Sequence, residues 1–319
     1  MRMSYKLQVT SYRLKLKVIG LFCLSVLCLI CNLQPAISQT LNLNQFGIEE
    51  GLPQSSIYTM IQDKDGNIWV GTMSGVSKYN GLNFENFNKK DGLAENRVTS
   101  SCLDKDGNIW FGHWSGGISK YDAAKKHFEE ITPGKFEIKK TINCILQDKS
   151  GVIWFGTEGQ GIIEMAGGNF TQVKDGLAGE VVNALAEDNT GTIWIGTSTG
   201  ITLSTSGKLS AYEGSLPSSS IRSLFSDSKG NIWIGSTDKG VFRTGADKQV
   251  KVYNSANGLS NENIRVIFED AGKNIFLGTY GGGVSKYNSA SKTFEEVKTG
   301  KIELKKTIIC IMQDKSGAV

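Results

Sequence analysis

The stretch QDKDGNIWVGT, Gln62 to Thr72, holds two acidic residues, a glycine, an asparagine and a tryptophan within eleven positions. Related stretches recur every 39 to 44 residues, and they start at Asp63, Asp104, Asp148, Asp188, Asp227, Asp270 and Asp314. Six positions after each of the first six aspartates stands an aromatic residue: Trp69, Trp110, Trp154, Trp194, Trp233 or Phe276. A repeat of about forty residues with tryptophan and glycine at fixed places is typical of a propeller blade or a solenoid unit.

Each aspartate follows a run in which apolar residues alternate with others, as in SIYTMIQD and NIRVIFED. This period of two is typical of a β-strand. Three further short strand patterns follow in each repeat, of the NIWVGT, GVSKY and NFENF types. Because no segment after the leader shows a useful helical period, the sequence predicts an all-β protein made of four-stranded propeller blades.

The two ends of the chain bear on the number of blades. Residues 41–46 resemble the fourth strand of a blade, and propellers commonly close by using such an N-terminal strand to complete the last blade. The seventh copy, at Asp314, stops at Val319. We therefore predict a seven-bladed propeller over residues 39–319 whose last blade is incomplete because the chain is truncated, with eight or more blades in a longer chain as the alternative.

The first 38 residues have the layout of a secretory signal peptide. Five basic residues and no acidic ones occupy the first 17 positions, and a 14-residue apolar run, Val18 to Cys31, follows. That run is short for a membrane span, which needs ~20 residues, so an uncleaved anchor is the less favoured alternative. Without the five basic residues the formal charge changes from +4 to −1, and no nucleic-acid partner is expected.

The units resemble the two-component regulator propeller repeat, through their I-x-x-I-x-QD-x-x-G-x-I-W-x-G-T core, G-V-S-K-Y continuation and F-x-x-F-x-x-x-DGL linker. In that family such propellers form the periplasmic sensor half of hybrid two-component systems, abundant in Bacteroidetes, and many respond to oligosaccharides. Two seven-bladed propellers typically precede a β-sandwich, a membrane span and a histidine kinase. The resemblance implies an extracytoplasmic sensor fragment without catalytic activity, whose partners are an oligosaccharide, a second receptor chain or further propeller and sandwich domains, and which meets a membrane only through a region outside this chain.

The acidic turn itself has competing interpretations. A repeated calcium loop is disfavoured, because copies such as DKSG and DNTG keep the first aspartate and lose the second. The sialidase-type Asp box needs an acid five residues before the tryptophan, whereas here the acids stand six and four before Trp69. A structural role fits better: the aspartate caps the turn, the glycine takes a positive φ, and the aromatic ring fills the space between blades. No metal or cofactor is predicted.

Candidate ligand contacts are the residues that differ between copies. Five positions before each aspartate the residue varies, and the loop after W-x-G varies as well. Aromatic faces stack on sugars, while arginine and asparagine bond hydroxyls. The candidate carbohydrate contacts are Tyr58, Trp114, Asn143, Arg222, Arg265 and Tyr280, with ordinary solvated or inter-propeller contacts as the alternative.

Enzymatic activity has little support in the sequence. After the leader there are two histidines, His113 and His127, and no nucleophile elbow or zinc signature. A propeller lyase or hydrolase and, more weakly, a quinone-dependent dehydrogenase stay as alternatives, as does a propeller used only for protein interaction. The cysteines after the leader, Cys102, Cys144 and Cys310, fit buried apolar positions better than a disulfide framework.

Overall fold

The computed structural model describes residues 44–216, 218, 220–245, 249–298 and 306–319, which belong to one compact unit. The predicted leader, residues 1–38, and residues 41–43 of the predicted N-terminal strand lie outside the described residues. The described part is all-β, with no α-helix and with two short 3-10 turns, η1 (Lys89–Asp91) and η2 (Ser255–Asn257). Within it, no helix has the length and apolar character that crossing a membrane requires.

Six antiparallel sheets of four strands make up this unit, and we call them blades 1 to 6. Blade 1 contains β1 (Ile57–Gln62), β2 (Ile68–Thr72), β3 (Gly75–Tyr79) and β4 (Phe84–Phe87); blade 2 contains β5 (Val98–Leu103), β6 (Ile109–His113), β7 (Ile118–Asp122) and β8 (His127–Ile131). Blade 3 contains β9 (Ile142–Gln147), β10 (Ile153–Thr157), β11 (Ile162–Ala166) and β12 (Asn169–Val173).

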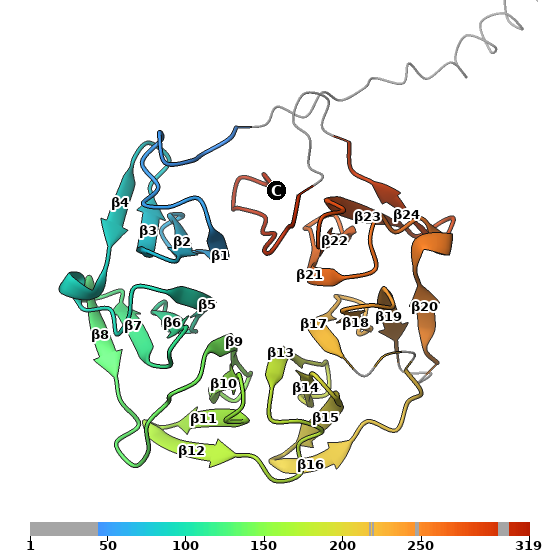
Figure 1. The fold of residues 1–319 in the computed structure, drawn as a ribbon, viewed down its shortest axis with the longest axis horizontal. Helices are drawn as coiled ribbons and strands as arrows, with labels where there is room; N and C mark the ends of the chain where they lie inside the picture. The colour runs from blue at the N-terminus through green and yellow to red at the C-terminus, as the bar shows by residue number, and fades with distance from the viewer. Residues whose placement is uncertain (1–43, 217, 219, 246–248, 299–305) are drawn as a thin grey trace, which may run out of the picture. The chain divides into compact units, whose positions relative to one another are not determined.

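Blade 4 contains β13 (Val182–Glu187), β14 (Ile193–Thr197), β15 (Gly200–Thr205) and β16 (Lys208–Ala211). Blade 5 contains β17 (Ile221–Ser226), β18 (Ile232–Ser236), β19 (Val241–Thr244) and β20 (Lys251–Tyr253). Blade 6 contains β21 (Ile264–Glu269), β22 (Ile275–Thr279), β23 (Val284–Asn288) and β24 (Thr293–Glu296). From blade 1 to blade 6, the first strand of each blade contacts the first strand of the blade that follows it in the chain, and these strands face the middle of the ring in Figure 1.

The prediction of seven blades is wrong, because the described residues form six four-stranded sheets. The seventh copy of the motif, residues 306–319, forms no strand. A strand needs a backbone partner along its length, and this segment has only isolated backbone bonds, such as Ile308 N–H to Thr279 O at 3.0 Å and Asp314 N–H to Ala318 O at 2.8 Å. Figure 1 shows it between blade 6 and blade 1.

The N-terminal end of the described region lies on blade 1. Asn44, Gln45 and Phe46 form no strand, and the ring of Phe46 packs against Tyr79 and Phe84, with centroids 5.1 and 5.9 Å apart. The described part of the predicted closing strand is therefore held by side-chain packing and has no place in a sheet.

The core consists of five separate clusters, one between each two blades that follow one another in the chain. Trp69 of blade 1, for example, packs with Phe111, Tyr121 and Phe128 of blade 2. The glycine of the W-x-G motif is required because neighbouring side chains pack directly against its backbone. A Cβ on Gly71 would lie 2.6 Å from Thr59 Cγ2 and 2.7 Å from Val98 Cγ1. The repeated motif thus specifies both the hairpin within a blade and the contact to the next blade.

Candidate functional site

The repeated aspartates close the first hairpin of each blade. In blade 1, Asp63 Oδ1 accepts a hydrogen bond from the backbone N–H of Asn67 (2.8 Å), while Oδ2 accepts from Trp69 Nε1 (2.8 Å). Gly66 has a φ of 93°, a left-handed conformation that favours glycine. The indole-to-carboxylate bond recurs at 2.8 to 2.9 Å in four more blades, between Trp110 and Asp104, Trp154 and Asp148, Trp194 and Asp188, and Trp233 and Asp227.

Blade 6 lacks that bond because Phe276 has no N–H group. Its aspartate, Asp270, still accepts the backbone N–H of Asn274 at 2.8 Å. Burial opposes ionisation of Asp63, but hydrogen bonds from Trp69 and Asn67 outweigh it and hold the pKa of this carboxyl below its ordinary value. The turn is thus occupied by its own hydrogen bonds. Among the described residues, no group of three or more His, Cys, Asp or Glu side chains is placed to hold a metal ion.

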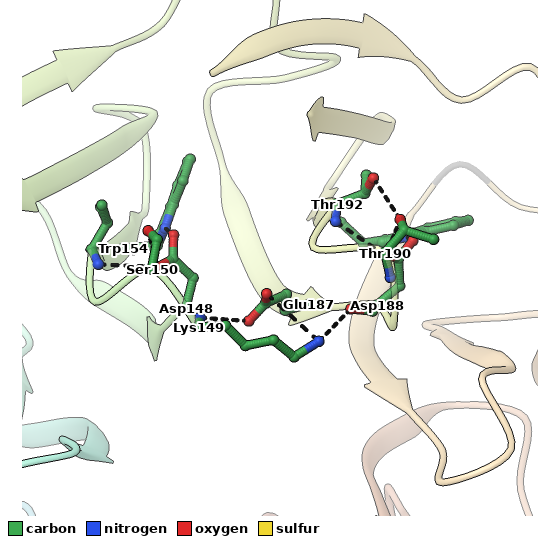
Figure 2. Close-up of polar contacts among 10 residues, drawn as sticks. Asp148, Lys149, Ser150, Trp154, Glu187, Asp188, Thr190 and Thr192 are labelled. Carbon is green, nitrogen blue, oxygen red and sulfur yellow. Dashed lines mark hydrogen bonds and ion pairs between the residues drawn. The ribbon is translucent and has the colours of Figure 1, made fainter. Parts of the chain in front are cut away.

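The turns also connect neighbouring blades. Figure 2 shows the junction of blades 3 and 4, where the backbone N–H of Lys149 donates to Glu187 Oε2 at 2.9 Å and Lys149 Nζ donates to Asp188 O at 2.8 Å. The same pattern, in which the residue after one aspartate donates to the residue before the next, recurs from Lys105 to Gln147, Ser228 to Glu269, Ala271 to Gln313 and Lys315 to Gln62. The last of these joins the C-terminal segment to blade 1.

The variable position five before each aspartate is a β-bulge in all six blades. In blade 1, Ile57 pairs with Thr72 and Thr59 pairs with Gly71, so Tyr58 is the extra residue. The same shift places an unpaired residue at Thr99, Asn143, Asn183, Arg222 and Arg265. Bulges redirect side chains and are common beside functional sites. The sequence did not predict the bulge. It did single out this position, because the residue there varies between the copies of the repeat.

Three bulge side chains hold neighbouring blades together. Thr99 Oγ1 donates to Ile142 O (2.8 Å), Asn143 Nδ2 donates to Val182 O (3.0 Å), and Asn183 Nδ2 donates to Ile221 O (2.9 Å). We call these bonds inter-blade clasps. The amide of Asn143, one of the candidate ligand contacts, is thus bonded to blade 4.

In blades 5 and 6 the bulge residue is an arginine. The guanidinium of Arg265 lies over the ring of Tyr280, 4.9 Å from its centroid, and Tyr280 is 54% exposed. Arg265 Nε and the neighbouring Asn263 Oδ1 are buried and have no hydrogen-bond partner among the described residues. The side chain of Arg222 is exposed. Its pKa is nevertheless below the ordinary value, because partial burial of the guanidinium and the positive charge of Arg265 outweigh the opposite effect of Glu158.

The structure thus brings Arg222, Arg265 and Tyr280 of the candidate set to one place, where blades 5 and 6 meet. We call these three residues together with Asn263 the arginine site. Asn263 was absent from the candidate set, and its position directly before the inner strand was the only sequence signal for it.

The other two candidates belong to other blades. Trp114 is 44% exposed, and its backbone N–H donates to Arg97 O (3.0 Å). Tyr58 is half-buried at the bulge of blade 1. Within the described part of the chain, no hydrogen bond, ion pair or ring contact joins either residue to the arginine site.

The histidines and cysteines take structural positions. His113 is fully buried, and its Nε2 is 2.8 Å from Ser119 Oγ. Burial lowers the pKa of His113 to about 4. His127 lies on β8, 3.1 Å from Glu129. Cys102, Cys144 and Cys310 are free thiols, and burial raises their pKa values to about 11, 12 and 12.

Comparisons with known proteins agree with the repeat pattern. Five segments match the family model for the two component regulator propeller: 51–74, 92–115, 138–159, 176–199 and 215–238. A solved structure described as the extracellular domain of a hybrid two component system from B. thetaiotaomicron is similar, with 28% identity and a TM-score of 0.74 over 84% of this chain. This chain spans 38% of the length of that structure. Among curated proteins, none matches.

Two enzymes share the fold. Streptogramin B lyase is 16% identical, with a TM-score of 0.66 over 84% of this chain and 90% of its own. Virginiamycin B lyase from Staphylococcus aureus is also 16% identical, with a TM-score of 0.67 over 78% of this chain and 85% of its own. At this identity the likeness concerns the fold alone, and a propeller fold hosts both binding proteins and enzymes.

Proposed function

This chain is built from repeats of the two-component regulator propeller family, and we propose that it is the extracytoplasmic sensing propeller of a signalling receptor that responds to an oligosaccharide. The similarity to an extracellular domain of a hybrid two component system supports the sensing role. The periplasmic location rests on the signal-peptide layout of residues 1–38.

The observation that carries the ligand proposal is the arginine site. Three bulge residues of the preceding blades serve in inter-blade clasps, whereas Arg265 Nε and, two residues earlier in the chain, Asn263 Oδ1 have no hydrogen-bond partner among the described residues. Leaving a buried polar group unpaired costs about 1–3 kcal/mol. The guanidinium of Arg265 can donate to a sugar hydroxyl, and the exposed ring of Tyr280 offers a stacking face.

Signalling would follow if the ligand bound one arrangement of two receptor chains more tightly than another. A ligand held at the arginine site, at the face of the propeller, favours the arrangement of two receptor chains that binds it better, and so shifts the equilibrium toward that arrangement. Any kinase that responds lies outside this chain. The propeller itself is proposed to be non-catalytic, and the position of His113 inside blade 2 and His127 on β8 supports this.

The test is binding of an oligosaccharide library to the purified chain on a glycan array, followed by calorimetry of each hit. Arg222→Ala and Arg265→Ala are expected to weaken binding at least tenfold, and Tyr280→Ala severalfold. Arg97→Ala, which removes an exposed arginine of blade 2, is the matched control and is expected to keep the affinity. Unchanged affinity in both arginine variants would refute the site.

A library without hits, combined with capture of a defined protein partner, would favour the interaction scaffold instead. Incubation with polysaccharides tests the enzymatic alternative, since a lyase or hydrolase releases unsaturated products or new reducing ends. We expect neither product.

A further inference from the structure

A cavity of about 850 Å³ lies between blades 4 and 5, away from the bulge residues. Small-molecule sites typically measure about 300–1,000 Å³, so its size suits a small ligand. Its lining includes Trp194, Tyr212, Thr190, Thr192, Thr205 and Thr244. We call it the blade 4/5 cavity.

The cavity lies at a junction where Thr244 takes a position that is tyrosine at two other junctions. At two other junctions the repeated tryptophan meets a tyrosine of the next blade: the ring centroids are 4.5 Å apart for Trp69 and Tyr121 and 5.2 Å apart for Trp233 and Tyr287. The tyrosine lies on the third strand of its blade, opposite the first residue of the second strand. In blade 2, for example, Tyr121 of β7 pairs with Ile109 of β6.

In blade 5 the residue at this position is Thr244, which pairs with Ile232. Trp194 therefore meets no tyrosine of the next blade, and its ring lies 5.1 Å from Tyr212 of the linker that follows β16. The absence of this tyrosine is not sufficient to open a cavity. At the junction of blades 3 and 4 the position is Ser204, which is 2% exposed, and Leu209 packs into that core.

The wall of the cavity carries a chain of hydroxyl groups. Thr190 Oγ1 donates to Asp188 Oδ1 at 2.6 Å and lies 3.1 Å from Thr192 Oγ1, which lies 3.1 Å from Thr205 Oγ1. Figure 2 shows Thr190 and Thr192 beside Asp188. Anchored hydroxyls of this kind both donate and accept, which matches the hydroxyl groups of a sugar.

The remaining lining adds an apolar surface and charged groups of both signs. The ring of Tyr212 is half-buried, and its hydroxyl is buried without a hydrogen-bond partner among the described residues. Charged lining residues have both signs, Glu213 and Lys229 among them. A mixed lining of this kind gives no preference for a strongly charged ligand.

We propose that the blade 4/5 cavity binds a neutral sugar of one or two units, independently of the arginine site. One face of the sugar ring packs against the apolar side of Tyr212 and the edge of Trp194, and its hydroxyls bond the threonine chain.

The experiment is calorimetry of the purified chain with maltose, cellobiose and xylobiose at millimolar concentration. Thr244→Tyr places at this junction the residue that blades 2 and 6 carry, and it fills the cavity; Thr192→Val removes one hydroxyl with little change of shape. At least one disaccharide is expected to bind, and each variant is expected to weaken it at least tenfold. Arg265→Ala is expected to leave this binding unchanged, which separates this cavity from the arginine site.

Absence of binding by all three disaccharides would overturn the proposal, as would equal affinity in the wild-type chain and Thr192→Val. If Thr244→Tyr fails to fold, Thr192→Val decides, because it keeps the volume of the side chain. A cavity that is only a packing defect predicts that Thr244→Tyr raises the thermal midpoint while no disaccharide binds the wild-type chain.

Discussion

At the scale of single residues, the recurring aspartate and tryptophan act as a pair. The carboxylate accepts both the turn amide and the indole N–H, as in Asp227, whose Oδ2 lies 2.9 Å from Trp233 Nε1. The tryptophan therefore contributes a buried ring and a hydrogen bond to a charged group, and the two contributions can be separated by mutation.

Trp233→Phe is expected to keep most of the ring packing but lose the bond to Asp227, which should destabilise the propeller by about 1.5–3 kcal/mol. Trp233→Ala loses the ring as well and should cost roughly 3–5 kcal/mol. Urea denaturation followed by circular dichroism measures both. Blade 6 has phenylalanine at this position naturally, so Phe276→Trp serves as the reciprocal variant. Equal losses for Trp233→Phe and Trp233→Ala would show that the bond, and not the ring, dominates.

His113 should give the protein a pH-dependent stability. Burial lowers its folded pKa from 6.5 to about 4, so the unfolded chain takes up the proton first as the pH falls. The stabilisation, at most about 3 kcal/mol, is complete above pH 6.5 and is lost between pH 6.5 and 4. Loss from Asp63, whose pKa is lowered in the folded protein, belongs to a window below its ordinary pKa of 3.8.

His113→Thr tests this, because the corresponding residues Thr72 and Thr157 donate to the loop carbonyls of Gly75 and Gly161. Denaturation midpoints of the variant between pH 7 and 4.5 are expected to vary less than those of the wild-type chain. An equal slope in the two proteins would contradict the assignment.

At the scale of elements, the sequence predicted the four strand types of each blade and the acidic hairpin turn, because alternation and turn residues are local signals. It did not predict the bulges, since a register shift depends on the partner strand. Asn143 and Arg222 occupy equivalent positions of the repeat and were therefore equal candidates in the sequence. Only the structure separates them, because the bond from Asn143 to Val182 O depends on the distance between two blades. Asn263 was missed because a single asparagine before a strand looks like an ordinary linker residue in the sequence, and the burial of its Oδ1 depends on the folded structure.

Close packing between the second strand of one blade and the first strand of the next should make Gly71 intolerant of substitution. An alanine Cβ there would lie 2.7 Å from Val98 Cγ1 of the next blade, and overpacking of this kind typically costs about 1–3 kcal/mol. Gly71→Ala is expected to lower the urea midpoint. Gly47→Ala is the control, because its Cβ meets only Glu50 Oε2, at 3.4 Å. Similar midpoints for the two variants would argue against a rigid junction.

At the scale of the whole molecule, the ring of six blades is connected at the turn face by repeated backbone-to-side-chain bonds. The prediction of a seventh blade failed there, because motif residues alone do not form a sheet without partner strands. Residues 306–319 nevertheless make the turn-to-turn bonds that join neighbouring blades: the backbone N–H of Ala271 donates to Gln313 Oε1 at 2.7 Å and that of Lys315 donates to Gln62 Oε1 at 2.8 Å. The segment thus bridges blades 6 and 1.

The bridge should be weaker than a junction between two complete blades. Gln62→Ala removes the acceptor of Lys315, while Gln147→Ala removes the equivalent acceptor of Lys105 between blades 2 and 3. Because residues 306–319 have few other backbone bonds, Gln62→Ala is expected to speed amide hydrogen exchange in this segment at least tenfold with little change in thermal midpoint. Gln147→Ala should leave exchange in the segment unchanged, because the hydrophobic core between its blades keeps that junction closed. Unaltered exchange in residues 306–319 of Gln62→Ala would mean that the bond to Gln62 does not hold the segment, which leaves the bonds of Lys315 Nζ to Asp63 O and Lys64 O and the packing of Ile308 against blade 6 to do so.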